Sequence, residues 1–333
     1  MINLGLLSGG ISGERYLSLE SGEYIIKSLS STGRYNIYRI DWIAPGQWVL
    51  FSNNGSEEYV AKSLPELISV IEKHGLHLDL LFDAFHGHEE ADGHISAVLE
   101  LVKSELGIPF VGNGMYTSFV GMDKMLTNGV FESGGLPVIT SFLVQKPSDP
   151  IPESVLKTTG FPCIIKPISS GSSLGITLAH SQEELNKALA SAEEKDYPYI
   201  IQPFIKGTEY GVAVVGSEDN IKELAAVEIK YPGEFFDAAC KEAGTYHMVR
   251  ADLPEKTLNQ LYDLARRAHI IIEATTVTRT DFIIGQDGRI WILEINTHPG
   301  LSCHSIVPAQ LEASGTSFAD FIEELINKQL NKK

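Results

Sequence analysis

The stretch RTDFIIGQDGRIWILEIN, residues 279–296, decides the fold of this chain. Two apolar runs lie on either side of the dipeptide Asp287-Gly288. This pattern is typical of two strands that pair through a tight turn. It predicts a hairpin with strands over 278–284 and 289–295.

Two carboxylates face each other across this predicted hairpin. Asp281 and Glu294 lie on its two strands, and Asn296 points to the same side as Glu294 because side chains alternate along a strand. Carboxylate and amide oxygens suit a Mg²⁺ ion that bridges phosphates. The alternative is a salt-bridged surface hairpin in which Arg279 is the partner. The apolar neighbours within 292–295 favour burial, and a buried carboxylate needs a cation.

The bulk composition limits the class of protein. The 333 residues carry a formal net charge of −17 and are 43% hydrophobic, which suits two or three packed subdomains. Such an acidic surface repels a phosphate backbone, so nucleic acid is not an expected partner. The three cysteines follow no metal-ligand spacing, and their low, odd number favours a reducing compartment. The chain begins without a basic leader and has no apolar run of membrane-spanning length, so we expect a cytoplasmic protein with no membrane span.

Apolar runs and helical patterns alternate in the first third of the chain, which predicts a parallel sheet covered by helices. Helices are expected over 13–29, 93–106, 115–135, 181–192, 254–273 and 305–330. Strands are expected over 2–7, 36–41, 78–85, 138–143, 162–166, 175–179, 198–204, 208–216 and 222–229, besides the hairpin. The segment 231–253 shows no period, and a loop of that length is often a functional lid.

A second pattern is Lys166 followed by the Gly- and Ser-rich run 168–175. Backbone N–H groups and hydroxyls of such a loop can bind phosphate oxygens, and the lysine adds a positive charge. It is not the Walker motif, because no Gly-Lys-Ser/Thr ends it and a strand follows. The alternative is a flexible hairpin turn.

Two further patterns lie near the predicted ends of N-terminal strands. Glu14 follows the Gly-rich turn 9–13, where an acidic side chain would oppose a phosphate but suit a substrate ammonium group. The alternative is a helix N-terminus that a negative charge stabilises. The run 86–94 holds three histidines and three acids, but the two-residue spacing of the histidines fits no common zinc pattern, so we interpret it as polar lining of a site.

Taken together, these patterns resemble the D-alanine–D-alanine ligases of the ATP-grasp superfamily. The matches occur in the family's order and cover nearly the whole chain. They are GGISGER (9–15), AFHGHEEADGHI (84–95), MDK (122–124), FPCIIKPISSGSSLGI (161–176), PFIKGTEYGVAVVG (203–216), RTDF (279–282) and LEINTHPGLSCHSIVP (293–308).

The resemblance implies an α/β ATP-grasp fold of three subdomains. They would be an N-terminal parallel-sheet substrate domain (1–115), a central ATP-grasp subdomain (116–208) and a C-terminal ATP-grasp subdomain (209–333) with the metal site and a mobile loop at 231–253. It implies that ATP phosphorylates the carboxylate of one D-alanine and that the amine of a second attacks the acyl phosphate, in peptidoglycan precursor synthesis. It also implies a homodimer.

Site residues follow from the matched positions. Two Mg²⁺ ions, or Mn²⁺, would be held by Asp281, Glu294 and Asn296. ATP would contact Lys124, Lys166, Ser173, Gln202, Phe204 and, at the ribose, Glu209. Catalysis would use Glu14 for the first ammonium group, Ser172 to link Glu14 to the mobile loop, and Arg279 with the N–H of Gly300 for the oxyanion. The first substrate would lie against His86, and the second carboxylate against Ser305 and Lys241.

This chain departs from the family pattern at several positions. Gln202 stands where the family has a glutamate, and His298 where a small or apolar residue is typical. Lys241 is followed by Glu242, where the family has a tyrosine that Tyr246 or His247 would replace. The alternatives therefore include a ligase that joins D-alanine to D-serine, D-lactate or another acid, and an ATP-binding relative without turnover. An ATP-grasp ligase for a different carboxylate is disfavoured by the runs GGISGER and HSIVP.

Overall fold

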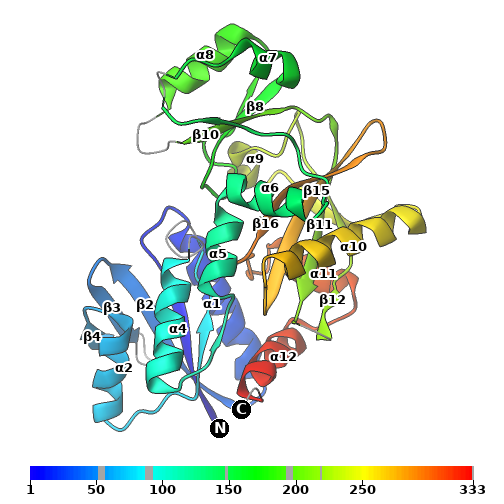
Figure 1. Cartoon of the computed structure of the whole chain (residues 1–333). Coiled ribbons are helices and arrows are strands. Elements are labelled where there is room, and N and C mark those ends of the chain that lie inside the picture. Colours follow the sequence, from blue (N-terminus) through cyan, green and yellow to red (C-terminus); the bar gives the residue numbers. More distant parts are fainter. Residues whose placement is uncertain (52–56, 87–92, 147–148, 193–197, 218–219, 332–333) are drawn as a thin grey trace.

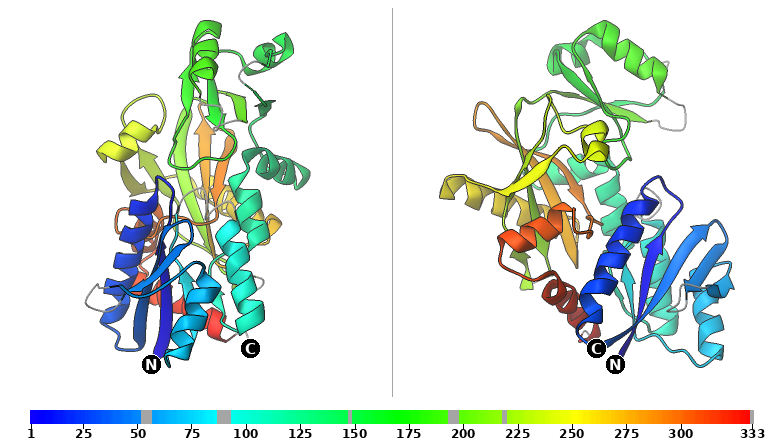
Figure 2. Two further views of the ribbon diagram at one scale, coloured as in Figure 1. Left: turned by 90° about the vertical axis from the view of Figure 1, so that its left-hand side faces the viewer. Right: turned by 180° about the vertical axis from the view of Figure 1, so that it is seen from behind.

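The computed structural model describes the chain except for residues 52–56, 87–92, 147–148, 193–197, 218–219 and 332–333. Three sheets follow one another through the molecule (Figure 1). The first sheet lies at one end with both termini, the second forms the opposite end, and the third lies between them (Figures 1 and 2). No helix in the described part of the chain has the length and apolarity that a membrane crossing requires.

The N-terminal sheet is mixed, with strand order β4-β3-β2-β1-β5-β6. Its strands β2, β1, β5 and β6 are parallel, as the alternating pattern predicts, whereas β3 and β4 form an antiparallel edge that the sequence did not reveal. The strands are β1 (Ile2–Gly9), β2 (Tyr35–Ala44), β3 (Gln47–Phe51), β4 (Glu57–Ala61), β5 (Leu80–Asp83) and β6 (Phe110–Val111). The helices are α1 (Arg15–Ser30), α2 (Leu64–Lys73) and α4 (His94–Leu106).

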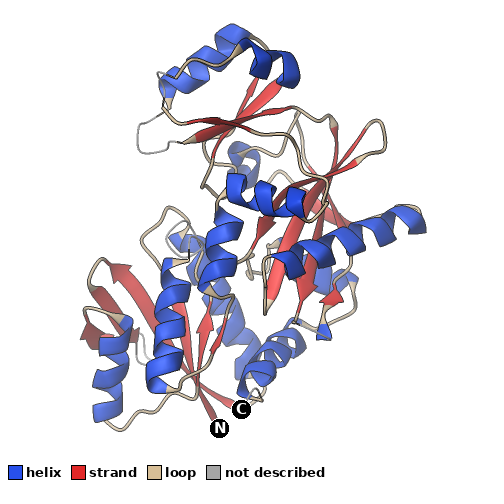
Figure 3. Ribbon diagram, in the orientation of Figure 1, coloured by secondary structure: helices blue, strands red, loops and turns tan. Residues whose placement is uncertain are grey.

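The second sheet has the order β7-β10-β8-β9 and is covered by helices on one face only (Figure 3). Its covered face supplies the core residues Cys163, Ile165, Tyr199 and Ile201. The opposite face carries Lys166, because side chains alternate along a strand. The elements are α5 (Met115–Met122), α6 (Lys124–Ser133), β7 (Phe142–Val144), α7 (Glu153–Thr159), β8 (Cys163–Pro167), β9 (Thr177–Ala179), α8 (Gln182–Ser191) and β10 (Tyr199–Pro203).

The third sheet is antiparallel, with order β14-β13-β11-β15-β16 and β12 paired to β11. Helix α10 packs on it through Leu261 and Ala265, beside Phe282 of β15. The elements are β11 (Gly207–Val215), β12 (Lys222–Glu223), β13 (Val227–Lys230), α9 (Ala238–Ala243), β14 (His247–Arg250), α10 (Glu255–Ile271), β15 (Val277–Gly285), β16 (Ile290–Asn296) and α11 (Ile306–Ala313).

The hairpin β15–β16 has the register predicted from the sequence. Asp281 pairs with Glu294, and Arg279 pairs with Asn296. A register shift after Asp281 marks a local irregularity of the pairing at this point. The hairpin therefore presents the two carboxylates side by side.

The segment 231–253 is more ordered than its sequence suggested. It contains the short helix α9 and the edge strand β14, which pairs with β13. The strand β14 forms because it pairs with β13, so its sequence shows little alternation of apolar and polar residues. Packing and pairing decide strand formation more than local propensity does.

The C-terminal helix α12 (Phe318–Leu330) joins the last part of the chain to the first. Phe321 and Ile326 lie in one core with Leu4 and Ile25 of the N-terminal domain, and α12 lies beside that domain in Figure 1. The strands of the three sheets occupy 2–111, 142–203 and 207–296. The domain limits at 115/116 and 208/209 stay a prediction.

Asn113 ties the segment after β6 to the third sheet. It is fully buried, and its amide nitrogen donates to the main-chain oxygens of Val277 (2.9 Å) and Thr297 (2.7 Å). Its amide oxygen accepts from the N–H groups of Thr275 (3.0 Å) and Thr276 (3.2 Å). One side chain thus satisfies four backbone groups: three where β15 begins, at 275–277, and one directly after β16, at Thr297.

His86 is a second link between the domains. Its Nδ1–H donates to the main-chain oxygen of His298 (3.1 Å), and since that carbonyl can only accept, Nε2 accepts from the hydroxyl of Ser21 (3.0 Å). The same hydroxyl oxygen accepts from the N–H of Leu301 (3.2 Å). Burial, together with the charges of the His298 ring and Arg279, lowers the pKa of His86 to about 4.

Asn113→Ala should leave these backbone groups without partners and lower the free energy of unfolding by about 3 kcal/mol. The urea midpoint of the variant measures this loss. Asn186→Ala, at an exposed position on α8, is the matched control. Equal midpoints for the two variants would contradict a bridging role of Asn113.

Acidification should destabilise the fold through His86. Because its folded pKa of about 4 lies below the ordinary value of 6.5, its contribution to stability is complete above pH 6.5 and is lost as the pH falls toward 4. The loss at pH 5 should be about 2 kcal/mol. Urea midpoints at pH 7.5 and 5 should converge in His86→Gln, but not in a variant of the exposed His304, His304→Gln. An unchanged pH dependence in His86→Gln would refute this account.

Candidate functional site

Four cations surround Glu294 in the gap between the second and third sheets. They are Lys124, Lys166, Lys241 and Arg279, and they come from α6, β8, α9 and β15. Burial would raise the pKa of Glu294, but these four charges outweigh it and the pKa is lowered. Glu294 is therefore a carboxylate at neutral pH with four cations around it, and cations gathered in this way suit polyanions.

Asp281 forms the tightest ion pair of the site. Arg279 donates from Nε to Oδ1 (2.7 Å) and from Nη2 to Oδ2 (2.7 Å), and Asn296 donates to Oδ2 (3.1 Å). Burial raises the pKa of Asp281; Arg279 opposes this shift and Glu294 adds to it. Arg279 thus stabilises the charged form of Asp281, which lies opposite Glu294.

The donor set around this pair fits a hard divalent cation. Glu294 accepts no hydrogen bond from any residue that the structure describes, and Asp281 uses three of its four acceptor positions. The described residues contain no cluster of three or more His, Cys, Asp or Glu that could hold a metal ion. Two carboxylates and one amide suit Mg²⁺ or Mn²⁺, which complete their coordination with water and substrate phosphates.

The two lysines of the central subdomain lie beside the Gly- and Ser-rich loop. Lys124 donates from its N–H to Ile168 O (3.1 Å) and from Nζ to Ser170 O (2.8 Å). Burial, and then the charge of Lys124, lowers the pKa of Lys166 to about 8. Both ammonium groups are thus buried beside the loop that the sequence marked as a phosphate site.

Glu14 contacts that loop across the domain boundary. The hydroxyl of Ser172 donates to Glu14 Oε1. A Cβ at Gly171 would lie 2.8 Å from Glu14 Oε2, so any larger residue there would displace the Glu14 carboxylate. Ser172 and Ser173 both have a positive φ, of 49° and 59°, which non-glycine residues rarely adopt and which functional sites often hold.

Lys241 lies at the same loop. Its Nζ donates to Ser173 Oγ (2.7 Å), and Ser173 donates to the main-chain oxygen of Phe236 (2.8 Å). The ammonium also lies 4.6 Å from the centre of the Phe236 ring. Segment 231–253 is therefore folded onto the site, with Lys241 beside the Gly- and Ser-rich loop.

Glu209 is held by a residue that sequence reasoning missed. The hydroxyl of Tyr231 donates to Glu209 Oε1 (2.8 Å), and the Tyr231 ring stacks on Phe236 with centroids 5.3 Å apart. Burial raises the pKa of Glu209 to about 7, although the Tyr231 bond opposes the shift. Tyr246 contacts Phe236 edge-on at 4.9 Å. Aromatic residues in a segment without period resemble ordinary core residues, so the pattern gave no signal.

Gly300 and Ser305 lie together beyond β16. A Cβ at Gly300 would lie 2.5 Å from Ser305 Oγ, and Ser305 Oγ is 3.0 Å from Ser302 Oγ. This turn lies near His86, whose ring bonds to His298 O. Of the run 86–94, residues 87–92 lie outside the part that the structure describes.

The remaining predicted ATP contacts lie on or beside β10. Gln202 is buried, and its amide nitrogen lies 2.7 Å from Ser141 Oγ. The N–H of Phe204 donates to Pro162 O (3.2 Å). Ser141 carried no sequence signal, because its partner is 61 residues away.

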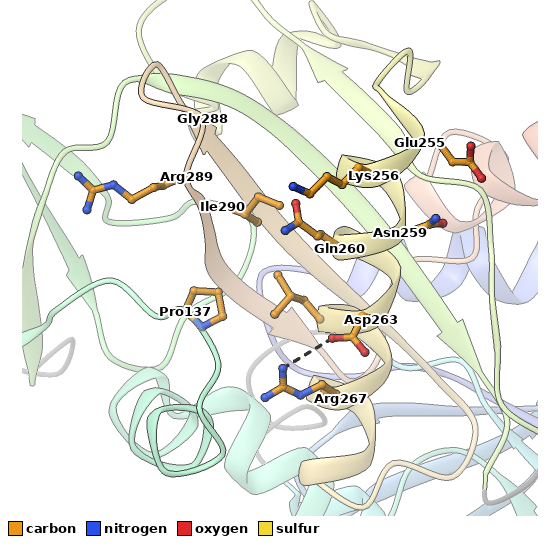
Figure 4. Close-up of a pocket in the computed structure, with 11 residues that line it drawn as sticks. Pro137, Glu255, Lys256, Asn259, Gln260, Asp263, Arg267, Gly288, Arg289 and Ile290 are labelled. Atoms are coloured by element: carbon orange, nitrogen blue, oxygen red, sulfur yellow. Dashed lines mark ion pairs between the residues drawn. The ribbon is translucent and has the colours of Figure 1, made fainter.

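A large groove lies away from these residues, between α10 and the turn of the β15–β16 hairpin (Figure 4). Its volume is about 1000 Å³, and an Arg267–Asp263 ion pair of 3.6 Å crosses one end. None of the predicted site residues lines it.

Solved structures of similar fold are ligases. The chain matches D-alanyl-alanine synthetase A of Vibrio cholerae with a TM-score of 0.81, 23% identity and coverage of 99% and 98% of the two chains. It matches the VanG D-Ala:D-Ser ligase of Enterococcus faecalis with a TM-score of 0.80, 23% identity and 98% coverage of each chain. It matches the ATP complex of a Bacillus anthracis D-alanine–D-alanine ligase with a TM-score of 0.77, 23% identity and coverage of 99% and 97%. The predicted ATP-grasp fold is confirmed.

Relatives found by sequence are named D-alanine–D-alanine ligases. A D-alanine–D-alanine ligase of Bacillus cytotoxicus is 32% identical over 354 residues, which covers 99% of this chain and 96% of the relative. One of Thermoanaerobacter sp. (strain X514) is 30% identical over 347 residues, covering 97% and 95%. The family model of the D-ala D-ala ligase C-terminus matches residues 130–327. With relatives of this identity along nearly its whole length, the chain belongs to the D-alanine–D-alanine ligase family.

Proposed function

We propose that this chain joins two D-alanine molecules at the expense of ATP, through a D-alanyl phosphate, in cytoplasmic peptidoglycan precursor synthesis. The observation that carries the proposal is the Asp281–Glu294 pair ringed by Lys124, Lys166, Lys241 and Arg279. A carboxylate is a poor electrophile because its oxygen leaves badly, and phosphorylation supplies a better leaving group. The transfer requires that the charges of phosphates and carboxylate be screened where they meet, which fixed cations in a dry site do well.

The nucleotide would lie along the face of the second sheet that carries Lys166, opposite the face covered by helices. Lys124, Lys166 and the loop with Ser173 would bind the phosphates. Asp281, Glu294 and Asn296 would hold two Mg²⁺ ions, whose charge would reduce the repulsion between the phosphates and the attacking carboxylate. At the other end of the nucleotide, the base would contact Gln202 and Phe204, and the ribose would contact Glu209.

The amino acids would lie on the side of the N-terminal domain. Glu14, linked to the phosphate loop through Ser172, would bind the ammonium group of the first D-alanine, with His86 behind it. Arg279 and the N–H of Gly300 would stabilise the oxyanion of the tetrahedral intermediate. Ser305 and Lys241 would receive the carboxylate of the second substrate.

A ligase for D-alanine and a different second substrate is the alternative that one observation favours. Glu242 follows Lys241 in the segment folded onto the site, where the family resemblance implies a tyrosine. Tyr246 lies in the same segment against Phe236. The second-substrate side of the site therefore differs from the family pattern.

We also infer a homodimer. The support is the family resemblance and the exposed apolar side chains on neighbouring helices α4 and α5. Leu101, Tyr116 and Phe119 are 52%, 47% and 53% exposed. Light scattering during gel filtration measures the mass of the particle.

A panel of second substrates tests the function. With ATP and D-alanine, D-alanine as second substrate should give phosphate and dipeptide at a kcat/KM at least tenfold above D-serine or D-lactate, about the discrimination that one methylene or one hydroxyl contact supplies. Phosphate release measures the rate with each second substrate, and mass spectrometry identifies the product. A preference for D-serine or D-lactate would establish the alternative, and ATP binding without ADP release would indicate a relative without turnover.

Glu294→Gln should reduce kcat by at least about 100-fold, because it removes the charge that balances the lysines and would bind the metal. The similar volume of glutamine should keep the thermal midpoint close to that of the parent. Glu312→Gln, exposed on α11, is the control and should keep full activity. A kcat near the parent value in Glu294→Gln would refute the metal assignment.

A further inference from the structure

We propose that Ser141 and Asn128 fix the side-chain amide of Gln202 with its oxygen toward the nucleotide, so that the site selects a 6-aminopurine over a 6-oxopurine. The inference rests on the proposed use of a nucleoside triphosphate. Gln202 would then determine base specificity, and Ser141 and Asn128 would act as positioning residues.

Gln202 stands on the same face of the second sheet as Lys166. On the antiparallel pair β8–β10, Gln202 pairs with Ile164 and Ile200 pairs with Lys166. Directly paired residues share a face, and so do residues two apart on one strand. Diagonal neighbours of this kind are about 7 Å apart. A nucleotide whose phosphates lie at Lys166 would therefore bring its base within reach of Gln202.

The hydroxyl of Ser141 determines which way the amide points. Its oxygen lies 2.9 Å from Ile139 O, 2.8 Å from Asn128 Nδ2 and 2.7 Å from Gln202 Nε2. A carbonyl can only accept, so the single hydroxyl proton goes to Ile139. Ser141 must then accept from both amides, and each of them must present its NH₂ group.

The contact with Ile139 reinforces this orientation. Gln202 Nε2 lies 3.5 Å from Ile139 O, so a rotated amide would place two carbonyl oxygens against each other. A glutamate at position 202 would lack the protons that Ser141 and Ile139 accept. The pocket made by 139–141 thus suits an amide, and Asn128 lies one turn after Lys124 on α6, on the same side of the helix.

The fixed amide leaves its oxygen for a ligand. Gln202 is only 4% exposed, and no described residue donates to its Oε1. Oε1 is not one of the fully buried atoms that lack a partner, so it stays accessible, and a ligand that brings an N–H there can form a hydrogen bond with it. The exocyclic amine of adenine is such a donor, whereas O6 of hypoxanthine or guanine is an acceptor and would repel Oε1.

Competition between ATP and ITP tests the proposal, because the two differ only at the six-position edge of the base. The full-length chain with D-alanine should use ATP about 100-fold better than ITP in kcat/KM. In Ser141→Ala and Asn128→Ala the amide can rotate, so this ratio should fall about tenfold, mainly through a lower KM for ITP. Gln202→Met should lose most of the discrimination while its thermal midpoint reports that it folds. Ser133→Ala, an exposed hydroxyl on the same helix α6, should keep the parent ratio.

The failure of this proposal differs from the failure of the proposed function. An ATP-to-ITP ratio that is the same in the parent, Ser141→Ala and Gln202→Met would overturn the base-reading role even if turnover with D-alanine is normal. If the parent releases no phosphate with D-alanine, the function fails instead. Calorimetric titration of ATP and ITP into the same four variants then decides the inference without turnover.

Discussion

The apposition of Asp281 and Glu294 across one hairpin is the constraint on which the rest of the site depends. Two adjacent carboxylates in a largely buried place repel each other and lose hydration, so they persist only when cations compensate them. The compensation comes from separate parts of the chain: α6 and β8 supply lysines, β15 supplies Arg279, and segment 231–253 supplies Lys241. The second and third sheets therefore meet where the charges balance.

Polar side chains attach the N-terminal domain to this charged centre. Asn113 and His86 bond mainly to backbone groups, and α12 adds an apolar contact. The neutral amide and imidazole keep their bonds above the pKa of His86, and a contact of 3.4 Å between Asp83 and His298 lies beside them. The same arrangement brings Glu14 to Ser172, so the proposed ammonium site and phosphate loop share one boundary.

The parts that sequence could predict are local ones. Two apolar runs joined by a short turn predict the hairpin, so Asp281 opposite Glu294 could be predicted without any relative, whereas the register shift after Asp281 could not. The bond from Ser172 to Glu14 spans 158 residues and came only from the family resemblance. Asn113, with partners 162 to 184 residues away, and Tyr231 on Glu209 left no pattern. The β3–β4 edge and β14 were missed because strand pairing, not periodicity, defines them.

Segment 231–253 contacts residues that we propose bind the nucleotide. Tyr231 donates to Glu209, and Lys241 donates to Ser173 in the Gly- and Ser-rich loop. Binding would therefore exchange one hydrogen bond for another at each place, and such exchanges change the free energy little. The aromatic stack of Tyr231, Phe236 and Tyr246 connects the two contacts. Lys241 also contacts the Phe236 ring, so one packed cluster links Glu209 to a cation that lies near Glu294.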